Sequence, residues 1–485
     1  MRTFFPHRAR PGPRPHARPA THTCTTLAVA TLLLAGCTTF SPDGGFDTVD
    51  RLSREHTGQA AVLQRSEAET GAAQARVTSL LAQPLSADSA VAIALLNNRG
   101  LQARYAELGI AEADLVRAGR PANPSISLGR LQGAGTVEID RAVLFDVLGL
   151  LSLPLARQAG QQRFAQAQLE AASATVALAM EVRVAFFDAV AAQQLAGYFG
   201  QAQDAADAAA ELAGRMVQAG NFSPLEQLRE QSFQAEAMAQ LGRARQQALA
   251  TRERLVRLLA LAGGPASLSL PDRLPALPAT PLDLPGAEQA AMDRRLDVRL
   301  ARQATAATAQ ALGLSRATRF INVLHAGAQT QSSTGEPRRN GVQVELELPL
   351  FDFGSTRVAQ AEAVYMQAVH HTAQVAIDAR SEVREAHAAY RSAEALARHQ
   401  QEAVLPLRRR IADETLLRYN GMLASAFELL ADARAQIGAV TTAVEALHGH
   451  WVAETRLQAA LAGVPAGAGL ALAPRRSAAG APAAH

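Results

Sequence analysis

Residues 342–350 read Val-Gln-Val-Glu-Leu-Glu-Leu-Pro-Leu, and apolar side chains alternate with polar ones as far as Glu347. Successive side chains of a β-strand point to opposite faces, so this segment predicts a strand with one apolar and one acidic face. Residues 320–331 lie upstream across a turn-like segment rich in Ser, Gly and Asn, which predicts a β-hairpin. An ordinary half-exposed strand of a soluble protein shows the same alternation. The alternation alone therefore does not identify the kind of sheet, and the surrounding sequence is needed.

Long helices are predicted around such hairpins. Residues 157–218 contain no Pro, and apolar or small residues recur there in steps of four, four and three. They are Val176, Met180, Val184, Phe187, Ala191, Leu195, Tyr198, Ala202, Ala206, Ala209, Ala213 and Val217. This spacing keeps one face in line along a nearly straight helix. A second rod is expected from Ser355 to Leu405, with a kink or break at Pro406. A coiled-coil hairpin of no particular function would show the same periodicity.

The sequence is duplicated at a spacing near 200 residues. The matching residues are Val182, Arg183, Leu195 and Gly220 in one copy and Val383, Arg384, Leu396 and Gly421 in the other. The first copy has candidate strands at 125–131 and 137–154, and its Leu153-Pro154-Leu155 resembles residues 348–350. The repeat therefore predicts two hairpins, each followed by a long helix, a turn and a returning helix.

This duplication and the terminal segments divide the chain. The expected parts are a signal peptide at 1–36, an N-terminal segment at 37–85, a first repeat at 86–263, a Pro-rich linker at 264–286, a second repeat at 287–463 and a disordered tail at 464–485. The prolines of the linker exclude a regular helix there, and the tail is rich in Ala, Gly and Pro.

The N-terminus is expected to be a targeting segment. Arginines precede an apolar run that ends in Leu34-Ala35-Gly36-Cys37, the order of a secretory signal. These four residues resemble the lipobox of bacterial lipoproteins, which implies lipidation of Cys37. Thr38 after it, by the same resemblance, implies sorting to the outer membrane. An ordinary cleaved signal with an incidental cysteine is the alternative.

Composition excludes several kinds of chemistry. All 47 basic residues among the 485 are Arg, so lysine nucleophiles, lysine bases and phosphate-loop lysines are absent. The adjacent His370 and His371 cannot share a helix face, and no recognised metal motif occurs. Arg408, Arg409 and Arg410 could form a nucleic-acid or headgroup patch, but a solvated face is favoured behind an export signal. We therefore expect no enzyme activity, cofactor, metal or nucleic-acid partner.

Four strands cannot close a membrane barrel, which needs about eight or more so that no edge faces lipid. Three copies of four strands would supply twelve. The acidic face of residues 342–350 would then line a lumen, while Val and Leu face lipid. Closure thus predicts a trimer.

The order of elements from about 86 to 463 resembles the TolC family of outer-membrane efflux factors. The residues that carry the resemblance are Ala94 to Asn98, Leu101, Pro121, Pro124, Leu348 to Phe351, Gly354, Tyr419, Gly421, Ser425, Leu429 and Leu430. The resemblance implies a mainly α protein with membrane β-strands. It implies a homotrimer with a twelve-stranded outer-membrane barrel and a helical tunnel across the periplasm. It also implies an exit duct that docks a periplasmic adaptor and an inner-membrane pump.

The resemblance also places a closure near the tip of the long helices, where Tyr419, Gly421 and Gly220 would form the turns. Glu428 falls on a family position that forms an acidic ring, whereas the next position holds Ala431 and the acid follows at Asp432. That shift of about 100° around the helix puts a second ring in doubt. A solvated helix face is the alternative for both carboxylates.

A protein of another class would share part of this pattern. A periplasmic coiled-coil adaptor or scaffold, tethered by lipid at Cys37, would have helical hairpins without a barrel. Adaptors usually carry lipoyl-like and barrel strands beside one hairpin, and no such flanks are visible in the sequence. The exit duct is therefore the favoured function.

Overall fold

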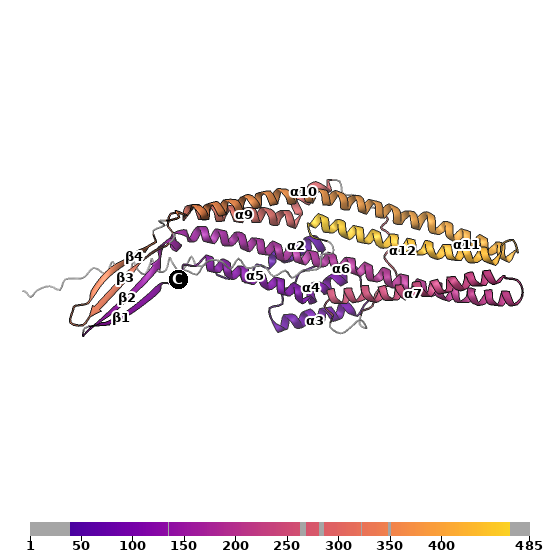
Figure 1. Cartoon of the computed structure of the whole chain (residues 1–485), viewed down its shortest axis with the longest axis horizontal. Coiled ribbons are helices and arrows are strands. Elements are labelled where there is room, and N and C mark those ends of the chain that lie inside the picture. The colour runs from indigo at the N-terminus through magenta and orange to yellow at the C-terminus, as the bar shows by residue number, and fades with distance from the viewer. Residues whose placement is uncertain are drawn as a thin grey trace, which may run out of the picture.

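The chain folds into a long rod with a sheet at one end and two helical turns at the other (Figure 1). The computed structural model describes residues 39–133, 135–261, 268–280, 286–321, 323–347 and 351–465. The short helices α2, α3 and α4, at residues 47–57, 67–81 and 87–97, lie along the middle of the rod (Figure 1). Among the described residues, no helix combines the length and apolar character needed to cross a bilayer.

The two predicted copies have the same order of elements, and two further helices, α2 (Asp47–Thr57) and α3 (Glu67–Leu81), precede the first copy. The first copy consists of α4 (Ala87–Asn97), α5 (Arg99–Ala118), β1 (Ser125–Gly133), β2 (Thr136–Asp146), α6 (Val147–Gln218) and α7 (Pro224–Leu258). The second consists of α8 (Ala287–Arg294), α9 (Leu296–Ala317), β3 (Leu324–Ser333), β4 (Arg339–Leu346), α10 (Ser355–His399), the π-helix η2 (Gln400–Val404), α11 (Leu405–Asn420) and α12 (Ala426–Ala462). Each copy has a hairpin between helices and ends in two long antiparallel helices.

All four strands form one antiparallel sheet in the order β1-β2-β3-β4. Its central pairing joins the two copies, because Phe145 of β2 lies opposite Ala326 of β3. The predicted hairpins are therefore confirmed, and they pair with each other within the chain.

The predicted inward stripe of α6 is confirmed at nine of its twelve positions, whereas Leu195, Tyr198 and Val217 are half-buried. Val176, Met180, Ala206 and Ala213 are at most 1% exposed. The long helix spans 72 residues, about 108 Å at 1.5 Å per residue. Small Ala side chains along the stripe allow α7 and α12 to pack closely against it.

One boundary differs from the sequence prediction. The second strand was expected to reach Pro154, but β2 ends at Asp146 and Pro154 lies near the start of α6. Asp146 explains the early end, because its Oδ1 accepts a 2.8 Å hydrogen bond from the Gly149 amide and caps the helix. The second rod does break near Pro406, where the π-helix η2 precedes α11.

Polar side chains at the junctions between short helices hold the ends of the long ones. Asn97 Nδ2 donates to the carbonyl oxygens of Leu259 at 2.9 Å and Ala260 at 2.7 Å. Arg295 Nη1 donates to the Ala460 carbonyl oxygen at 2.7 Å in the second copy. Carbonyls at a helix C-terminus lack the usual partner within the helix, and Asn97 supplies one to Leu259 and Ala260. Arg295 adds a second donor to the Ala460 carbonyl oxygen, which also accepts from the Gly463 amide at 3.3 Å.

Candidate functional site

One face of the sheet is apolar in the half nearest the helices, whereas Arg130, Arg141, Thr330 and Asn340 lie on the same face toward the hairpin ends. Partners in an antiparallel pair point to the same face, so the register places Val344, Ala326 and Phe145 together. The exposed large apolar side chains of this face are Ile126, Leu128, Val143, Phe145, Val342, Val344 and Leu346. Soluble proteins rarely expose so large an apolar surface, which indicates that lipid or protein covers it.

The opposite face is mainly polar. It carries Glu138 and Asp140 on β2, Gln331 on β3, and Gln343 and Glu345 on β4. Gln331 Nε2 donates to Glu138 Oε1, across the boundary between the two copies. Such a face can remain in water, and it confirms the acidic side predicted from residues 342–350.

The outer strands of the sheet leave two pairing edges open. Within the described chain, β1 pairs only with β2, and β4 pairs only with β3. An even number of antiparallel strands makes β1 and β4 run in opposite directions. An edge strand presents unpaired N–H and C=O groups, so β4 of one copy can pair with β1 of another in the antiparallel sense.

Exposed aromatic side chains surround the junction between sheet and helices. Phe145 ends β2, Phe320 precedes β3, and Phe351 and Phe353 precede α10. Phe351 is fully exposed, and the Arg319 guanidinium lies 4.0 Å from the centroid of the Phe320 ring. Aromatic girdles of this kind mark the interfaces of membrane barrels.

A glycine permits the close chain approach at this junction. Gly354 has φ +75°, and a Cβ there would lie 2.4 Å from the Arg319 carbonyl oxygen. Glycine alone combines that conformation with that contact. The position matches the glycine expected from the sequence to follow the last strand.

The two helical turns at the far end begin their second helices alike. Ser223 and Glu226 form a capping box at α7, and Ser425 and Glu428 form one at α12. The Glu428 carboxylate accepts a 3.0 Å hydrogen bond from the Ser425 amide. Glu428 is exposed and has this local role, which the sequence motif Ser-x-x-Glu would have predicted.

The two turns correspond in the structure with a shift of one residue from the correspondence that the sequence repeat predicted. Gly220 has φ +76°, and the residue in the same left-handed position of the second turn is Met422 at φ +56°. Gly421 precedes it with φ −82°, so Gly220 corresponds to Met422 and not to Gly421. Tyr419 lies one helical turn before, and its carbonyl oxygen accepts from the Met422 amide at 3.0 Å.

Asp432 lies one turn beyond Glu428 on α12. Its Oδ2 accepts a hydrogen bond from Thr415 Oγ1, which ties α12 to α11. Residues four apart share a helix face, so the structure brings Glu428 and Asp432 onto one side of α12.

The ends of both turns expose apolar side chains. Met422 and Leu423 are 94% and 82% exposed, and Leu417, Leu225 and Leu228 are also exposed. Exposed apolar clusters of this kind mark surfaces that bind other proteins.

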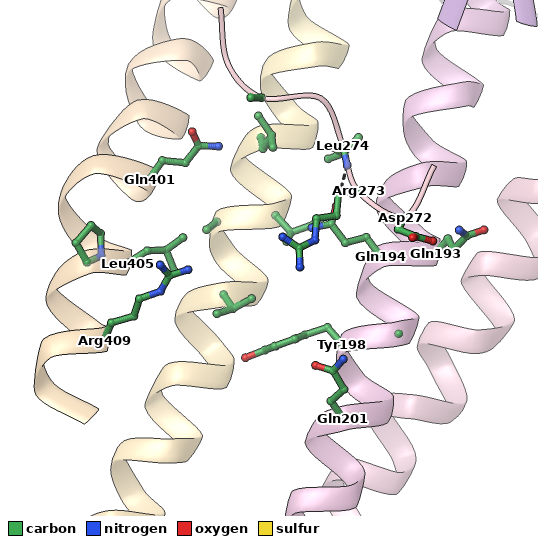
Figure 2. A pocket seen from close by; sticks show the side chains of 17 residues that line it. Gln193, Gln194, Tyr198, Gln201, Asp272, Arg273, Leu274, Gln401, Leu405 and Arg409 are labelled. Carbon is green, nitrogen blue, oxygen red and sulfur yellow. Dashed lines mark hydrogen bonds between the residues drawn. The ribbon is translucent and has the colours of Figure 1, made fainter. Parts of the chain in front are cut away.

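Halfway along the rod a cleft of about 880 Å³ opens between α6, α12, the start of α11 and the linker (Figure 2). The linker crosses it in an irregular conformation, and the Leu274 amide donates to Gln194 Oε1 at 3.0 Å. Arg273 from the linker and Arg409 from α11 enter the cleft from different sides (Figure 2). No local sequence motif brings these two arginines together. Among the described residues, no three His, Cys, Asp or Glu side chains group as metal ligands would.

No protein-family model and no curated protein matches this sequence. Solved structures do match its fold. CusC shares 18% identity over 80% of this chain and 92% of its own, with a TM-score of 0.65. The outer-membrane protein VceC of Vibrio cholerae shares 16% identity over 81% of this chain and 97% of its own, with a TM-score of 0.63. The MtrE outer-membrane channel of Neisseria gonorrhoeae, solved in its open state, shares 16% identity over 81% of this chain and 90% of its own, with a TM-score of 0.63.

The chain has the TolC-family fold.

In this TolC-type fold the sequence motifs have definite places. Asn97 and Asn98 are the junction residues that hold the end of α7, since Asn98 Nδ2 donates to the Leu258 carbonyl oxygen at 3.0 Å. Val182 and Val383, one from each repeat, are both fully buried. Cys37, residues 1–36 with the expected signal peptide, residues 348–350 and most of the tail lie outside the described residues.

Proposed function

We propose that this chain is the exit duct of a tripartite efflux system, conducting substrates across the outer membrane. The main support for this proposal is the sheet. It has an apolar face and a polar face, and its two unpaired edge strands run in opposite directions. The similar structures include the outer-membrane channels CmeC of Campylobacter jejuni and MtrE, which supports the same function.

The duct is a homotrimer. Pairing β4 with β1 of the next copy gives three times four strands, a closed barrel in which no edge faces lipid. Strands of 8 to 11 residues suit a tilted transmembrane barrel, which needs roughly 9–11 residues per strand. The apolar face then contacts lipid, the acidic face lines the lumen, and the aromatic side chains lie at the interface below it.

The helices continue the conduit through the periplasm. The exposed apolar turns around Met422 and Leu225 contact a periplasmic adaptor, which joins the duct to an inner-membrane pump. Three copies of Glu428, with Asp432 beside it, surround the narrow end of the tunnel. Their carboxylates attract cations and repel one another, which affects selectivity and opening.

Cys37 carries the lipid that anchors the chain to the outer membrane after removal of residues 1–36. The mature protein then comprises the N-terminal segment 37–85, the two repeats with their linker, and the tail 464–485. Replacing Cys37 with Ser is expected to abolish incorporation of labelled fatty acid. Persistent labelling of this variant would contradict the anchor without affecting the channel.

Purification in mild detergent and planar-bilayer recording test the duct. We expect a trimer by light scattering and discrete conductance steps after insertion. A detergent-free soluble monomer without conductance would refute the proposal. The alternative, a coiled-coil adaptor without a barrel, does not account for the sheet, since a tethered scaffold needs no apolar face on four strands.

A further inference from the structure

The cleft at the middle of the rod contains two arginines without partners. Neither Arg273 nor Arg409 forms a hydrogen bond or ion pair with any other residue of the described chain. Most other arginines near the linker are engaged, as Arg398 is with Glu394 at 2.9 Å. Two unpaired guanidinium groups facing one space form a positive site.

The backbone that carries Arg273 is held in place. Leu274 is 6% exposed and its amide is bonded to Gln194 of α6. Trp451 Nε1 of α12 donates to the Pro275 carbonyl oxygen at 3.0 Å, and Arg398 Nη2 of α10 donates to that of Pro278 at 3.3 Å. Three helices thus fix the linker, so Arg273 extends from a rigid support and little ordering is needed on binding.

The polar groups of the cleft are suited to an anion. Figure 2 shows the Arg273 and Arg409 side chains converging, while Asp272 lies apart from them beside Gln193. The Tyr198 side chain also extends into the space (Figure 2). Burial raises the pKa of Tyr198, so its phenol remains a hydrogen-bond donor at neutral pH.

The other wall is apolar. Ala443, Val444 and Leu447 of α12 are buried at the back of the cleft, and Leu405 lies beside them. A cavity of about 880 Å³ is within the range of sites for organic ligands, which is roughly 300–1,000 Å³, and it is far larger than an inorganic anion.

We propose that this cleft binds an amphiphilic organic anion. Its carboxylate or phosphate group lies between Arg273 and Arg409, where guanidinium groups form charge-assisted hydrogen bonds, and its apolar body packs on α12. Binding connects the linker to α11 directly after the π-helix, because both segments line the cleft. The binding test below does not depend on conduction.

Isothermal titration of the full chain in lipid nanodiscs tests the site. The probes are 2-naphthoate and 2-naphthyl phosphate, with 2-naphthamide and inorganic phosphate as controls and empty nanodiscs as the blank. We expect the two organic anions to bind, and Arg273→Gln and Arg409→Gln each to weaken binding at least tenfold. Arg410→Gln is the matched control, because this exposed neighbour does not line the cleft. Hydrogen exchange should show added protection of residues 273–276 in the wild type.

Several results would overturn the proposal. Equal binding of 2-naphthamide would show an apolar cavity without anion selectivity. Equal binding of inorganic phosphate would show that the apolar wall contributes nothing. An equal loss in Arg410→Gln would indicate general surface charge. Normal conductance in Arg273→Gln together with lost binding would support the site, and it would leave the proposed duct unaffected.

Discussion

Arg295 and Ala460 join the start of α9 to the end of α12 through a buried hydrogen bond of 2.7 Å. The Arg295 guanidinium is 2% exposed and also contacts Asp297 and Glu382, each at 2.6 Å. A Cβ at Gly463 would strike Asp297, so the chain end is shaped around this cluster. The first copy achieves the same connection with the uncharged Asn97.

Replacing Arg295 with Met is expected to lower the free energy of unfolding by about 2 kcal/mol, because it removes the hydrogen bonds of a buried guanidinium to the Ala460 carbonyl oxygen and to the Asp297 and Glu382 carboxylates. Thermal dissociation of the trimer in detergent measures the effect. The exposed Arg294→Met should change stability by no more than about 0.5 kcal/mol. Similar losses in the two variants would show that the cluster contributes no specific stability.

Two adjacent residues of β4 test which face of the sheet contacts lipid. Val344→Asp places a charge on the apolar face and should cost on the order of 2 kcal/mol per chain, preventing outer-membrane insertion. Gln343→Asp places the same charge on the polar face and should insert normally. Membrane fractionation with a trimer assay distinguishes them. The reverse order of tolerance would mean that the faces are assigned the wrong way round.

The left-handed residues of the two turns should respond oppositely to substitution. Met422→Gly relieves a conformation that costs a side chain roughly 1 kcal/mol, whereas Gly220→Ala introduces that cost. Hydrogen exchange at the ends of α11 and α6 should slow in the first variant and accelerate in the second. Faster exchange in Met422→Gly would show that contacts of the Met side chain outweigh the backbone strain.

Charge and capping can be separated at Glu428. Glu428→Gln keeps an acceptor for the Ser425 amide, so stability should change little. If three carboxylates line the narrow end, the same variant should reduce the cation preference of the channel several-fold. Glu226→Gln is the control, because it occupies the matching cap of the first turn. Unchanged selectivity in Glu428→Gln would assign Glu428 to capping alone.

Stability should fall in mild acid because of His450. Its ring is 0% exposed, between Tyr390 and Trp451, and neither ring nitrogen has a hydrogen-bond partner in the described chain. Burial lowers the pKa of His450, opposed by the charge of Glu394 and assisted by that of Arg398. The unfolded chain therefore binds a proton first, so stability is greatest above about pH 6.5 and declines as the pH falls below it.

Trimer dissociation temperatures at pH 5.5 and 7.5 measure this decline. His450→Phe should reduce the difference, whereas the exposed His371→Phe should retain it. Nearby Glu454 has the opposite effect on stability. Burial raises its pKa, so the folded chain binds this proton more readily than the unfolded chain and gains stability as the pH falls. An unchanged difference in His450→Phe would exclude this histidine as the source.

Local patterns in the sequence were sufficient for the elements themselves. The stripe from Val176 to Ala213 indicated which side of α6 is buried, because a helix repeats its faces at a fixed spacing. Alternation from Val342 to Leu346 likewise assigned the two faces of β4. Both depend only on residues close together in the chain.

Predictions from local sequence patterns were wrong at two places, the end of β2 and the pairing of the turn glycines. Leu153-Pro154-Leu155 resembled the end of a strand, but the cap at Asp146 starts a helix before it, and that helix continues through Pro154, its eighth residue. The pairing of Gly220 with Gly421 failed because a glycine beside the turn is not necessarily the residue in the left-handed conformation.

Sequence alone thus determined the repeat, the helical stripe and the two-faced strands, since each follows from backbone periodicity. Only the tertiary structure decided that β2 pairs with β3, that Arg295 meets Ala460, and that Arg273 and Arg409 share a cleft. These contacts join residues more than a hundred positions apart. Packing and the need to satisfy buried polar groups determine which residues meet, and a local sequence pattern contains neither kind of information.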